Sequence, residues 1–308
     1  PLFIYSFMMM LVQVLPRDKL AAATGWFWAM YSVGIGVVGS YLPSLTIPML
    51  GETGTLWLAI VWVACGGVLA YFSLRNVPVD RSRVNLPLRD KMTEMSRAVT
   101  ILFTNQHVFY ACLIRIINTL SLFGFAIIMP LLFVDRLGFT ISEWLQIWAV
   151  FFFVTIFTNI FWGITGEKLG WIRQVRWFGC LGMAISSLAF YYLPLYAGHN
   201  FWVALIPAIM LGIFVAAFVP MTAVFPTLEP HHKGAAVSIY NLSAGLSNFV
   251  APAIASLLLP FFDIVGVVWA YTALYLVAGV LTFIIRVPQP GHTREASAVK
   301  SSVVQQRS

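Results

Sequence analysis

The stretch GITGEKLGWIRQVR, residues 163–176, is a short polar segment between two long apolar runs. Its glycines allow a tight turn, and its Glu, Lys and Arg residues carry charges that a lipid interior disfavours. The flanking runs, about 141–164 and 176–197, each reach the roughly 20 apolar residues that an α-helix needs to cross a bilayer. The segment therefore predicts a loop that joins two membrane-spanning helices.

The composition of the chain indicates the same class of protein. Of the 308 residues, 60% are hydrophobic and only 9% are charged, whereas soluble proteins carry about 25% charged residues. We therefore expect an all-α integral membrane protein that contacts the lipid bilayer. Cys65, Cys112 and Cys180 each lie in an apolar run, so we interpret them as buried hydrophobic residues. Neither a disulfide framework nor a metal or cofactor site is expected.

The apolar runs predict eight full spans and part of a ninth. The partial span is 1–15, and the chain opens on Pro1 inside an apolar run. We therefore expect an N-terminal truncation and no signal peptide. The full spans are predicted at about 21–48, 54–74, 107–134, 141–164, 176–197, 201–226, 234–260 and 264–286.

Two polar segments divide this helical pattern. The stretch 75–106 mixes both charge signs and contains prolines, which is typical of a linker. We predict that it joins the remainder of an N-terminal helix bundle, 1–74, to a C-terminal bundle of six helices, 107–286. The tail 287–308 is rich in Ser and charged residues and is predicted to be a disordered cytoplasmic segment.

The distribution of Lys and Arg predicts the orientation of the helices. If 1–15 ends on one side of the membrane, that side holds 16 of the 18 Lys and Arg residues, including Arg176 at a helix edge. The opposite loops hold only Arg136, and Arg115 lies inside a span. Cytoplasmic loops are enriched in Lys and Arg, so this side is predicted to be the cytoplasm and the net charge of +7 is no sign of nucleic-acid binding. The loops counted are 16–20, 75–106, 165–175, 227–233 and the tail after 285.

The opening stretch follows the pattern G-x-x-x-acid-basic-x-G with further basic residues. This pattern resembles the loop signature of the major facilitator superfamily, in its second-half copy. The matching residues, which we predict to act in the loop and in gating, are Gly163, Glu167, Lys168, Gly170 and Arg173. By the pseudo-symmetry of that fold, Glu167 is expected near the start of the 21–48 helix, close to residues 22–24.

Longer stretches are similar to the bacterial polyol permeases of that superfamily, which include carriers of ribitol and D-arabinitol. Among them are GWFWAMYSVGIGVVGSYLPS, RIINTLSLFGFAIIMP and LEPHHKGAAVSIYNLSAGLSNFVAPAIA, starting at residues 25, 115 and 228. The resemblance implies two six-helix bundles, with this chain starting in the fourth helix. It also implies a monomeric, multi-pass protein of the bacterial inner membrane that takes up a polyol together with protons and is not an enzyme.

The span 107–134 contains Arg115, whose positive charge inside a span is not explained by the predicted orientation of the helices in the membrane. Arg115 lies about 12 Å into this helix at the helical rise of 1.5 Å per residue, and Asn118 and Thr119 follow it on the same face. Three interpretations remain open: a cavity-lining or gating side chain, a structural pair with another helix, and an arginine that extends towards the membrane surface. The polar neighbours favour the first.

The span 234–260 carries a second polar stripe. Asn241, Ala244, Gly245 and Asn248 recur at helical spacing, with Tyr240 beside them. Amides donate and accept hydrogen bonds and suit a hydroxylated ligand, whereas a stripe of small residues also suits close helix packing. The sequence leaves both interpretations open.

The span 141–164 supplies aromatic and hydroxyl candidates. Trp148 and Thr155 lie deep in this span, and an aromatic ring can stack on the C–H face of a polyol. Trp144 lies nearer the end and is interpreted as an interfacial residue. Tyr271 and Tyr275 lie on the last helix, which in this fold lies outside the cavity, so we do not expect them at the site.

The acidic residues bear on the mechanism. All eleven Asp and Glu residues fall in loops, helix ends or the tail, whereas a proton symporter needs an intramembrane carboxylate with a raised pKa. We expect the coupling acid in helices that precede this chain. An organic acid such as 2-oxoglutarate is the alternative substrate, because Arg115 suits a carboxylate. A membrane enzyme or sensor is disfavoured, since no catalytic group of residues or large soluble domain is evident.

Overall fold

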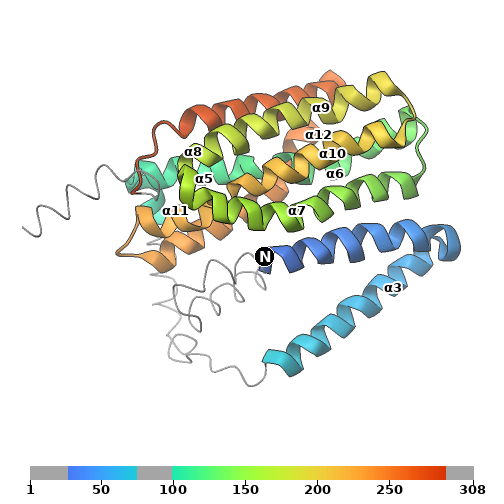
Figure 1. Ribbon diagram of the computed structural model, residues 1–308, viewed down its shortest axis with the longest axis horizontal. Helices are drawn as coiled ribbons and strands as arrows, with labels where there is room; N and C mark the ends of the chain where they lie inside the picture. Colours follow the sequence, from blue (N-terminus) through green and yellow to red (C-terminus); the bar gives the residue numbers. More distant parts are fainter. Residues whose placement is uncertain (1–26, 75–98, 289–308) are drawn as a thin grey trace, which may run out of the picture.

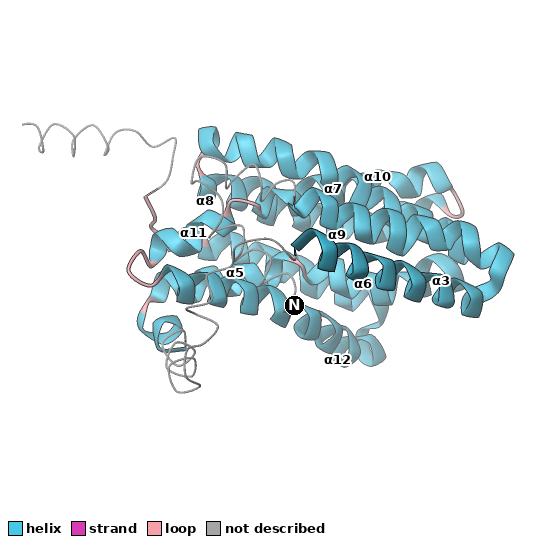
Figure 2. Ribbon diagram, turned by 90° about the horizontal axis from the view of Figure 1, so that it is seen from below, coloured by secondary structure: helices cyan, strands magenta, loops and turns pink. Residues whose placement is uncertain are grey.

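The computed structural model describes residues 27–74 and 99–288. All regular secondary structure in these two ranges is helical, as predicted, and the helices are joined by short loops (Figure 2). Six apolar helical stretches are long enough to cross a membrane. Two of them, of 47 and 48 residues, are interrupted by a single non-helical residue, Gly51 and Asp263 respectively. Each of the two therefore contains two spanning helices joined by a sharp turn.

The helices keep the predicted order along the chain, and the predicted partial span 1–15 lies outside the described residues. The first hairpin comprises a helix from residue 27, the π-helical turn η1 (Gly34–Tyr41) and α3 (Leu42–Leu74). The others are α5 (Gln106–Asn118), α6 (Leu120–Pro130), η2 (Leu131–Arg136), α7 (Ile141–Leu169), α8 (Trp171–Gln174), η3 (Val175–Leu181), α9 (Gly182–Ala197), α10 (Phe201–Val215), η4 (Ala216–Phe218), α11 (Met221–Leu228) and α12 (Lys233–Leu281).

The first helix of the hairpin packs against α7 through small residues (Figure 1). Ala29, Ser32, Gly36 and Ser40 are buried and recur every three or four residues, so they form one face. A Cβ atom built on Gly36 would lie 2.5 Å from the Cβ of Phe152 on α7. Small residues at such a crossing let two helices approach closely, as is common in membranes.

The second helix of the hairpin, from Gly51 to the end of α3, presents its apolar side chains outward. Trp57, Trp62, Tyr71 and Phe72 are all exposed, and Figure 1 shows this helix on the side of the hairpin away from the bundle. Cys65 on this helix is also exposed, so the expectation of three buried cysteines was wrong for Cys65 and right for the other two. An exposed apolar surface of this kind suits contact with lipid or with further helices.

The helices from α5 to α12 share one hydrophobic core, which gathers side chains from Ile101 to Ile285. Aromatic rings fill its centre: Phe125, Phe133, Trp144 and Trp148 all pack around Phe190 with ring centroids 5.6 to 6.3 Å apart. Such packing fixes the relative positions of α6, α7 and α9. The division of the chain at 75–106 stays a prediction, since residues 75–98 lie outside the described ranges.

Local sequence signals start several of these helices. The Asn105 side chain accepts hydrogen bonds from the backbone N–H groups of His107 and Val108 at the start of α5. Thr140 and Glu143 form a reciprocal capping box at the start of α7. Asn200 caps α10 through the N–H of Val203. Each cap satisfies backbone donors that a helix start leaves free.

The turn inside α12 replaces the short connection predicted between 260 and 264. Asp263 has φ 57° and ψ −171°, a conformation that residues other than glycine rarely adopt. Its carboxylate accepts two hydrogen bonds from Arg136 at the end of η2, with N–O distances of 2.7 and 2.6 Å. This bidentate ion pair ties the turn to the end of the α5–α6–η2 stretch.

Candidate functional site

The predicted span 107–134 is interrupted near its centre. The first part, α5, ends at Asn118, and α6 begins at Leu120. Thr119 between them has φ −106° and ψ 17°, which departs from helical geometry. A break of this kind frees backbone groups and redirects the side chains next to it. Arg115, Asn118 and Thr119 therefore lie at a helix discontinuity, which their spacing in the sequence did not indicate.

Arg115 is buried within the protein. Its exposed fraction is 5%, and its Nε and Nη1 atoms have no hydrogen-bond partner among the described residues. The guanidinium carbon lies 4.8 Å from the centre of the Tyr240 ring on α12, a cation–π arrangement. Tyr31 of the first hairpin lies within electrostatic range of the same group. This burial disagrees with an arginine that extends to the membrane surface.

Asn118 and Thr119 add two further unpaired polar atoms next to Arg115 in the sequence. The Oδ1 atom of Asn118 and the Oγ1 atom of Thr119 are buried and have no hydrogen-bond partner in the part of the chain that the structure describes. A buried polar group left without a partner costs about 1–3 kcal/mol. Together with Arg115, these residues present four such atoms at one helix break. Unpaired buried polar atoms of this kind are expected at a site that binds a hydrogen-bonding ligand.

The residues of the predicted stripe on α12 make two different kinds of contact. Tyr240 joins the Arg115 group, as described, and packs edge-on against Phe225. Asn241 and the exposed Asn248 donate to carbonyls of their own helix, at 3.0 Å to Val237 and 3.2 Å to Gly245. The structure therefore unites Tyr240 with the predicted site and leaves the two amides bonded within α12.

Close packing of α12 on α5 uses a different face from the predicted stripe. Ser247 donates to the carbonyl of Ile116 at 2.7 Å, and Ser243 donates to the sulfur of Cys112 at 3.0 Å. Both serines are fully buried. Hydroxyl groups on a neighbouring face of α12 therefore form the described contact with α5, and helix packing by the asparagine stripe stays a prediction.

The aromatic and hydroxyl candidates on α7 are engaged in the core. Trp148 is buried and stacks between Trp144 and Phe151, with centroid distances of 5.4 and 5.1 Å. Trp144 is itself buried, so its interpretation as an interfacial residue was wrong. The Thr155 hydroxyl donates to carbonyls of its own helix, at 2.7 Å to Phe152. These side chains stabilise the bundle, and a role for them in ligand binding stays a prediction.

The loop segment 163–176 is more helical than predicted. The end of α7 continues to Leu169, and only Gly170, with φ 90° and ψ 134°, adopts a conformation that favours glycine. Close approach to a neighbouring helix is not found at Gly163, where a Cβ atom would meet nothing within 4 Å among the described residues. It occurs at Gly166, where a Cβ atom would lie 2.9 Å from Pro220.

Three of the four charged residues of this segment lie on its surface. Glu167, Lys168 and Arg173 are exposed, and the predicted neighbour of Glu167 at residues 22–24 lies outside the described ranges. The segment is anchored instead by Gln174, which is fully buried. Its amide donates to the carbonyls of Trp162 and Ala217, at 3.2 and 3.0 Å, and so joins α7 to η4.

Comparison with known proteins identifies the family. The model of the Major Facilitator Superfamily matches the chain twice, over residues 2–195 and 111–307. The chain belongs to this superfamily. Its members are membrane transporters, so the protein is a multi-pass transporter of the major facilitator type and not an enzyme.

Several individual members of this superfamily are similar to the chain in sequence. The chain is 62% identical over 298 residues to a ribitol transporter of Klebsiella pneumoniae, covering 97% of this chain and 70% of the relative. It is 61% identical to a D-arabinitol transporter of the same organism, covering 98% of this chain and 71% of the relative. An alpha-ketoglutarate permease of Bacillus subtilis is 42% identical, with coverage of 92% and 64%.

The structure brings residues to the helix break that the sequence did not predict there. Tyr275 of α12 lies in hydrogen-bond contact with the break itself. Ser121 and Ser187 pair across α6 and α9, with 2.8 Å between their hydroxyl oxygens. Tyr275 was predicted to lie outside the site. The sequence did not indicate its contact with the break, because the residues that it contacts lie more than 150 positions away along the chain.

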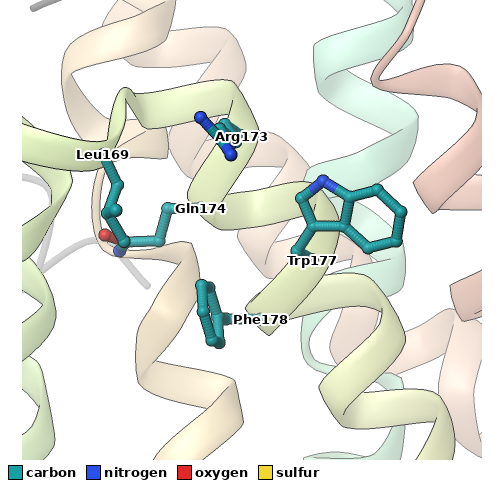
Figure 3. Close-up of a pocket in the computed structure, with 5 residues that line it drawn as sticks. All are labelled: Leu169, Arg173, Gln174, Trp177 and Phe178. Carbon is teal, nitrogen blue, oxygen red and sulfur yellow. The ribbon is translucent and has the colours of Figure 1, made fainter. Parts of the chain in front are cut away.

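A surface pocket of about 430 Å³ lies beside the loop segment and away from the helix break. Figure 3 shows its lining side chains, which are mainly apolar and include Arg173 and Trp177. Trp177 and Phe178 are exposed. Among the described residues, no group of His, Cys, Asp and Glu side chains is arranged to hold a metal ion. The lining residues are Leu169, Arg173, Gln174, Trp177 and Phe178.

Proposed function

We propose that this transporter carries a linear sugar alcohol, ribitol or D-arabinitol, across the bacterial inner membrane by alternating access. The names of the two relatives that are 62% and 61% identical support this class of substrate. In the proposed cycle, the first hairpin and the bundle from α5 to α12 belong to two halves that rock about a site near the middle of the membrane.

The observation that carries the proposal is the group of unpaired polar atoms at the helix break. Arg115 offers N–H donors, the Asn118 Oδ1 atom is an acceptor, and the Thr119 hydroxyl can do either. Each hydroxyl group of a polyol likewise donates and accepts, so a polyol can satisfy all of them without bringing a charge. The Tyr240 ring beside the guanidinium supplies an apolar face for the carbon chain.

We further propose that uptake is coupled to protons and that the protein is a monomer in the membrane. None of the described acidic residues is buried; among them Glu52, Asp135 and Glu167 are exposed, so the coupling acid is sought outside the described ranges. A protonophore should abolish accumulation of labelled ribitol while leaving its equilibration across the membrane intact. Accumulation that survives the protonophore would rule out proton symport.

One observation favours a second candidate, an organic acid such as 2-oxoglutarate. The Arg115 guanidinium is buried, and none of the described acidic residues forms an ion pair with it. A carboxylate would neutralise this charge and bind through two parallel hydrogen bonds. The alpha-ketoglutarate permease is the more distant of the relatives compared, at 42% identity, and we therefore rank this candidate second.

Uptake measurements separate the two candidates. Cells without their own polyol and dicarboxylate carriers would produce the protein and receive labelled ribitol, D-arabinitol or 2-oxoglutarate in turn. We expect saturable uptake of at least one polyol, inhibited by the other, and no uptake of the acid above the empty-vector control. Uptake of 2-oxoglutarate with no uptake of either polyol would contradict the proposal and establish the second candidate.

A further inference from the structure

The Tyr275 hydroxyl group makes both of its hydrogen bonds with backbone atoms at the helix break. It accepts a hydrogen bond from the N–H of Ser121 at 3.1 Å and donates one to the carbonyl of Asn118 at 3.0 Å. The side chain is completely buried and comes from the second half of α12. One tyrosine thus joins the last residue of α5 to the first turn of α6.

These two bonds take the place of regular helix bonding. In an uninterrupted α-helix, the N–H of Ser121 would donate to the carbonyl of Ile117, four residues earlier. Here the tyrosine hydroxyl receives that N–H instead, which is one of the recognised causes of a helix kink. The backbone N–H of Ser121 and the carbonyl of Asn118 are therefore both paired at the break, so these two backbone groups carry no desolvation penalty.

Tyr271, one turn earlier on α12, provides a contrast. It is equally buried, but its hydroxyl donates at 2.7 Å to the carbonyl of Ala251, which belongs to α12 itself. Its ring packs over Gly124 on α6, which leaves no room for a side chain there. Tyr271 therefore holds α12 against α6 without a hydrogen bond to the residues at the break.

We propose that Tyr275 is a positioning residue for the substrate: by holding the break open, it fixes the directions in which Asn118 and Thr119 present their unpaired polar atoms. The inference rests on the proposed function, since it assigns Tyr275 to the site where the polyol would bind. It also gives the last helix a part in recognition, although Tyr275 itself does not touch the substrate.

Replacing Tyr275 with Phe tests this role with little change in packing. The Phe ring fills the same space but offers no hydroxyl, so the N–H of Ser121 is free to bond Ile117 and the helix can straighten. We expect the KM of ribitol uptake to rise about tenfold in Tyr275→Phe, with Vmax per surface-exposed carrier changed less than twofold. Tyr271→Phe also loses one buried hydrogen bond and is the matched control, with KM within twofold of wild type.

A combined variant distinguishes positioning from general weakening of the fold. If Tyr275 acts through Asn118 and Thr119, adding Tyr275→Phe to a protein that already carries Asn118→Ala and Thr119→Val should raise the KM no further, because the groups being positioned are already gone. Multiplying effects in the combined variant, or equal effects of Tyr275→Phe and Tyr271→Phe, would overturn the inference.

The failure of the inference and the failure of the proposed function give different results. If Asn118→Ala and Thr119→Val leave ribitol uptake unchanged, the break is not the binding site and the proposed function of the site fails. If those two variants raise the KM and Tyr275→Phe does not, the site stands and the positioning role of Tyr275 is overturned.

Discussion

At the scale of single residues, Arg115 places a positive charge inside the protein where no carboxylate among the described residues forms an ion pair with it. Its exposed fraction is 5%, and its described contact is the face of the Tyr240 ring. Guanidinium groups tolerate such surroundings better than ammonium groups, because their charge is delocalised and their plane can stack on an aromatic ring. We therefore expect the site to depend on arginine specifically and not only on positive charge.

Replacing Arg115 with Lys tests this dependence. We expect the KM for ribitol to rise at least tenfold, about 1.4 kcal/mol, because lysine lacks the planar group that stacks on Tyr240 and presents fewer fixed donors. Initial rates of labelled ribitol uptake over a range of concentrations give the KM. The exposed Arg286 is the control, and Arg286→Lys should behave as wild type. Equal KM values for the two lysine variants would contradict the assignment of Arg115.

The polar residues at the helix break could be predicted from the sequence, whereas the residues that contact them could not. The spacing of Arg115, Asn118 and Thr119 on one helix face is a local property of the sequence. The charge of Arg115 inside a predicted span indicated that this helix contributes to the site. The contacts of Tyr275 with Asn118 and of Tyr240 with Arg115 join residues more than 120 positions apart. Helical periodicity says nothing about such pairs, because they depend on how whole helices are packed.

At the scale of elements, the contact between the first hairpin and α7 depends on small side chains. Gly36 faces Phe152 at a distance that excludes a Cβ atom, whereas a Cβ atom on Gly34 would meet nothing within 4 Å. These two glycines lie half a turn apart on the same helix and differ only in the face that they occupy. They form a matched pair for testing the contact between the helices.

Alanine at position 36 should push the two helices apart and lower the thermal stability of the purified protein in detergent. Gly36→Ala should lower the melting temperature by several degrees, on the order of 1–3 kcal/mol for an overpacked contact. Gly34→Ala should leave it unchanged or slightly higher, because alanine favours helix more than glycine does. Equal melting temperatures for the two variants would show that this packing does not contribute to stability.

The loop segment 163–176 gives a second matched pair of glycines. A Cβ atom on Gly166 would crowd Pro220 and the Gln174 amide, at 2.9 and 3.2 Å, whereas one on Gly163 would meet nothing within 4 Å. Gly166→Ala should therefore reduce the rate of polyol uptake several-fold at equal surface expression, and Gly163→Ala should not. A larger loss for Gly163→Ala would favour the motif glycine predicted from the sequence over the contact seen in the structure.

The spans themselves were predictable, whereas the details of their geometry were not. Hydropathy alone indicated the helices, because a membrane requires about 20 consecutive apolar residues. The break at Thr119 and the turn at Asp263 each coincide with a tertiary contact, with Tyr275 in the first case and Arg136 in the second. The extension of α7 to Leu169 went unpredicted because charged residues end the apolar run before the helix itself ends.

At the scale of the whole molecule, the arrangement of Lys and Arg predicts which ends of the helices face the cytoplasm. Fusions of alkaline phosphatase, which is active only outside the cytoplasm, report the side directly. We expect activity for fusions after Gly138 and Gly198 and none for a fusion after Gly170, because cytoplasmic loops carry the excess of Lys and Arg. The reverse pattern would place the loop segment 163–176 outside and overturn the predicted orientation.

The proposed transport function depends on a polyol binding at the helix break between α5 and α6. The most direct measurement is the affinity of labelled ribitol and D-arabinitol for the purified protein, compared with the double variant Asn118→Ala, Thr119→Val. We predict that the wild type binds at least one of the two polyols and that the double variant binds it at least tenfold more weakly, since two of the four unpaired polar atoms are removed. Equal affinities, or no polyol binding by the wild type, would contradict this account.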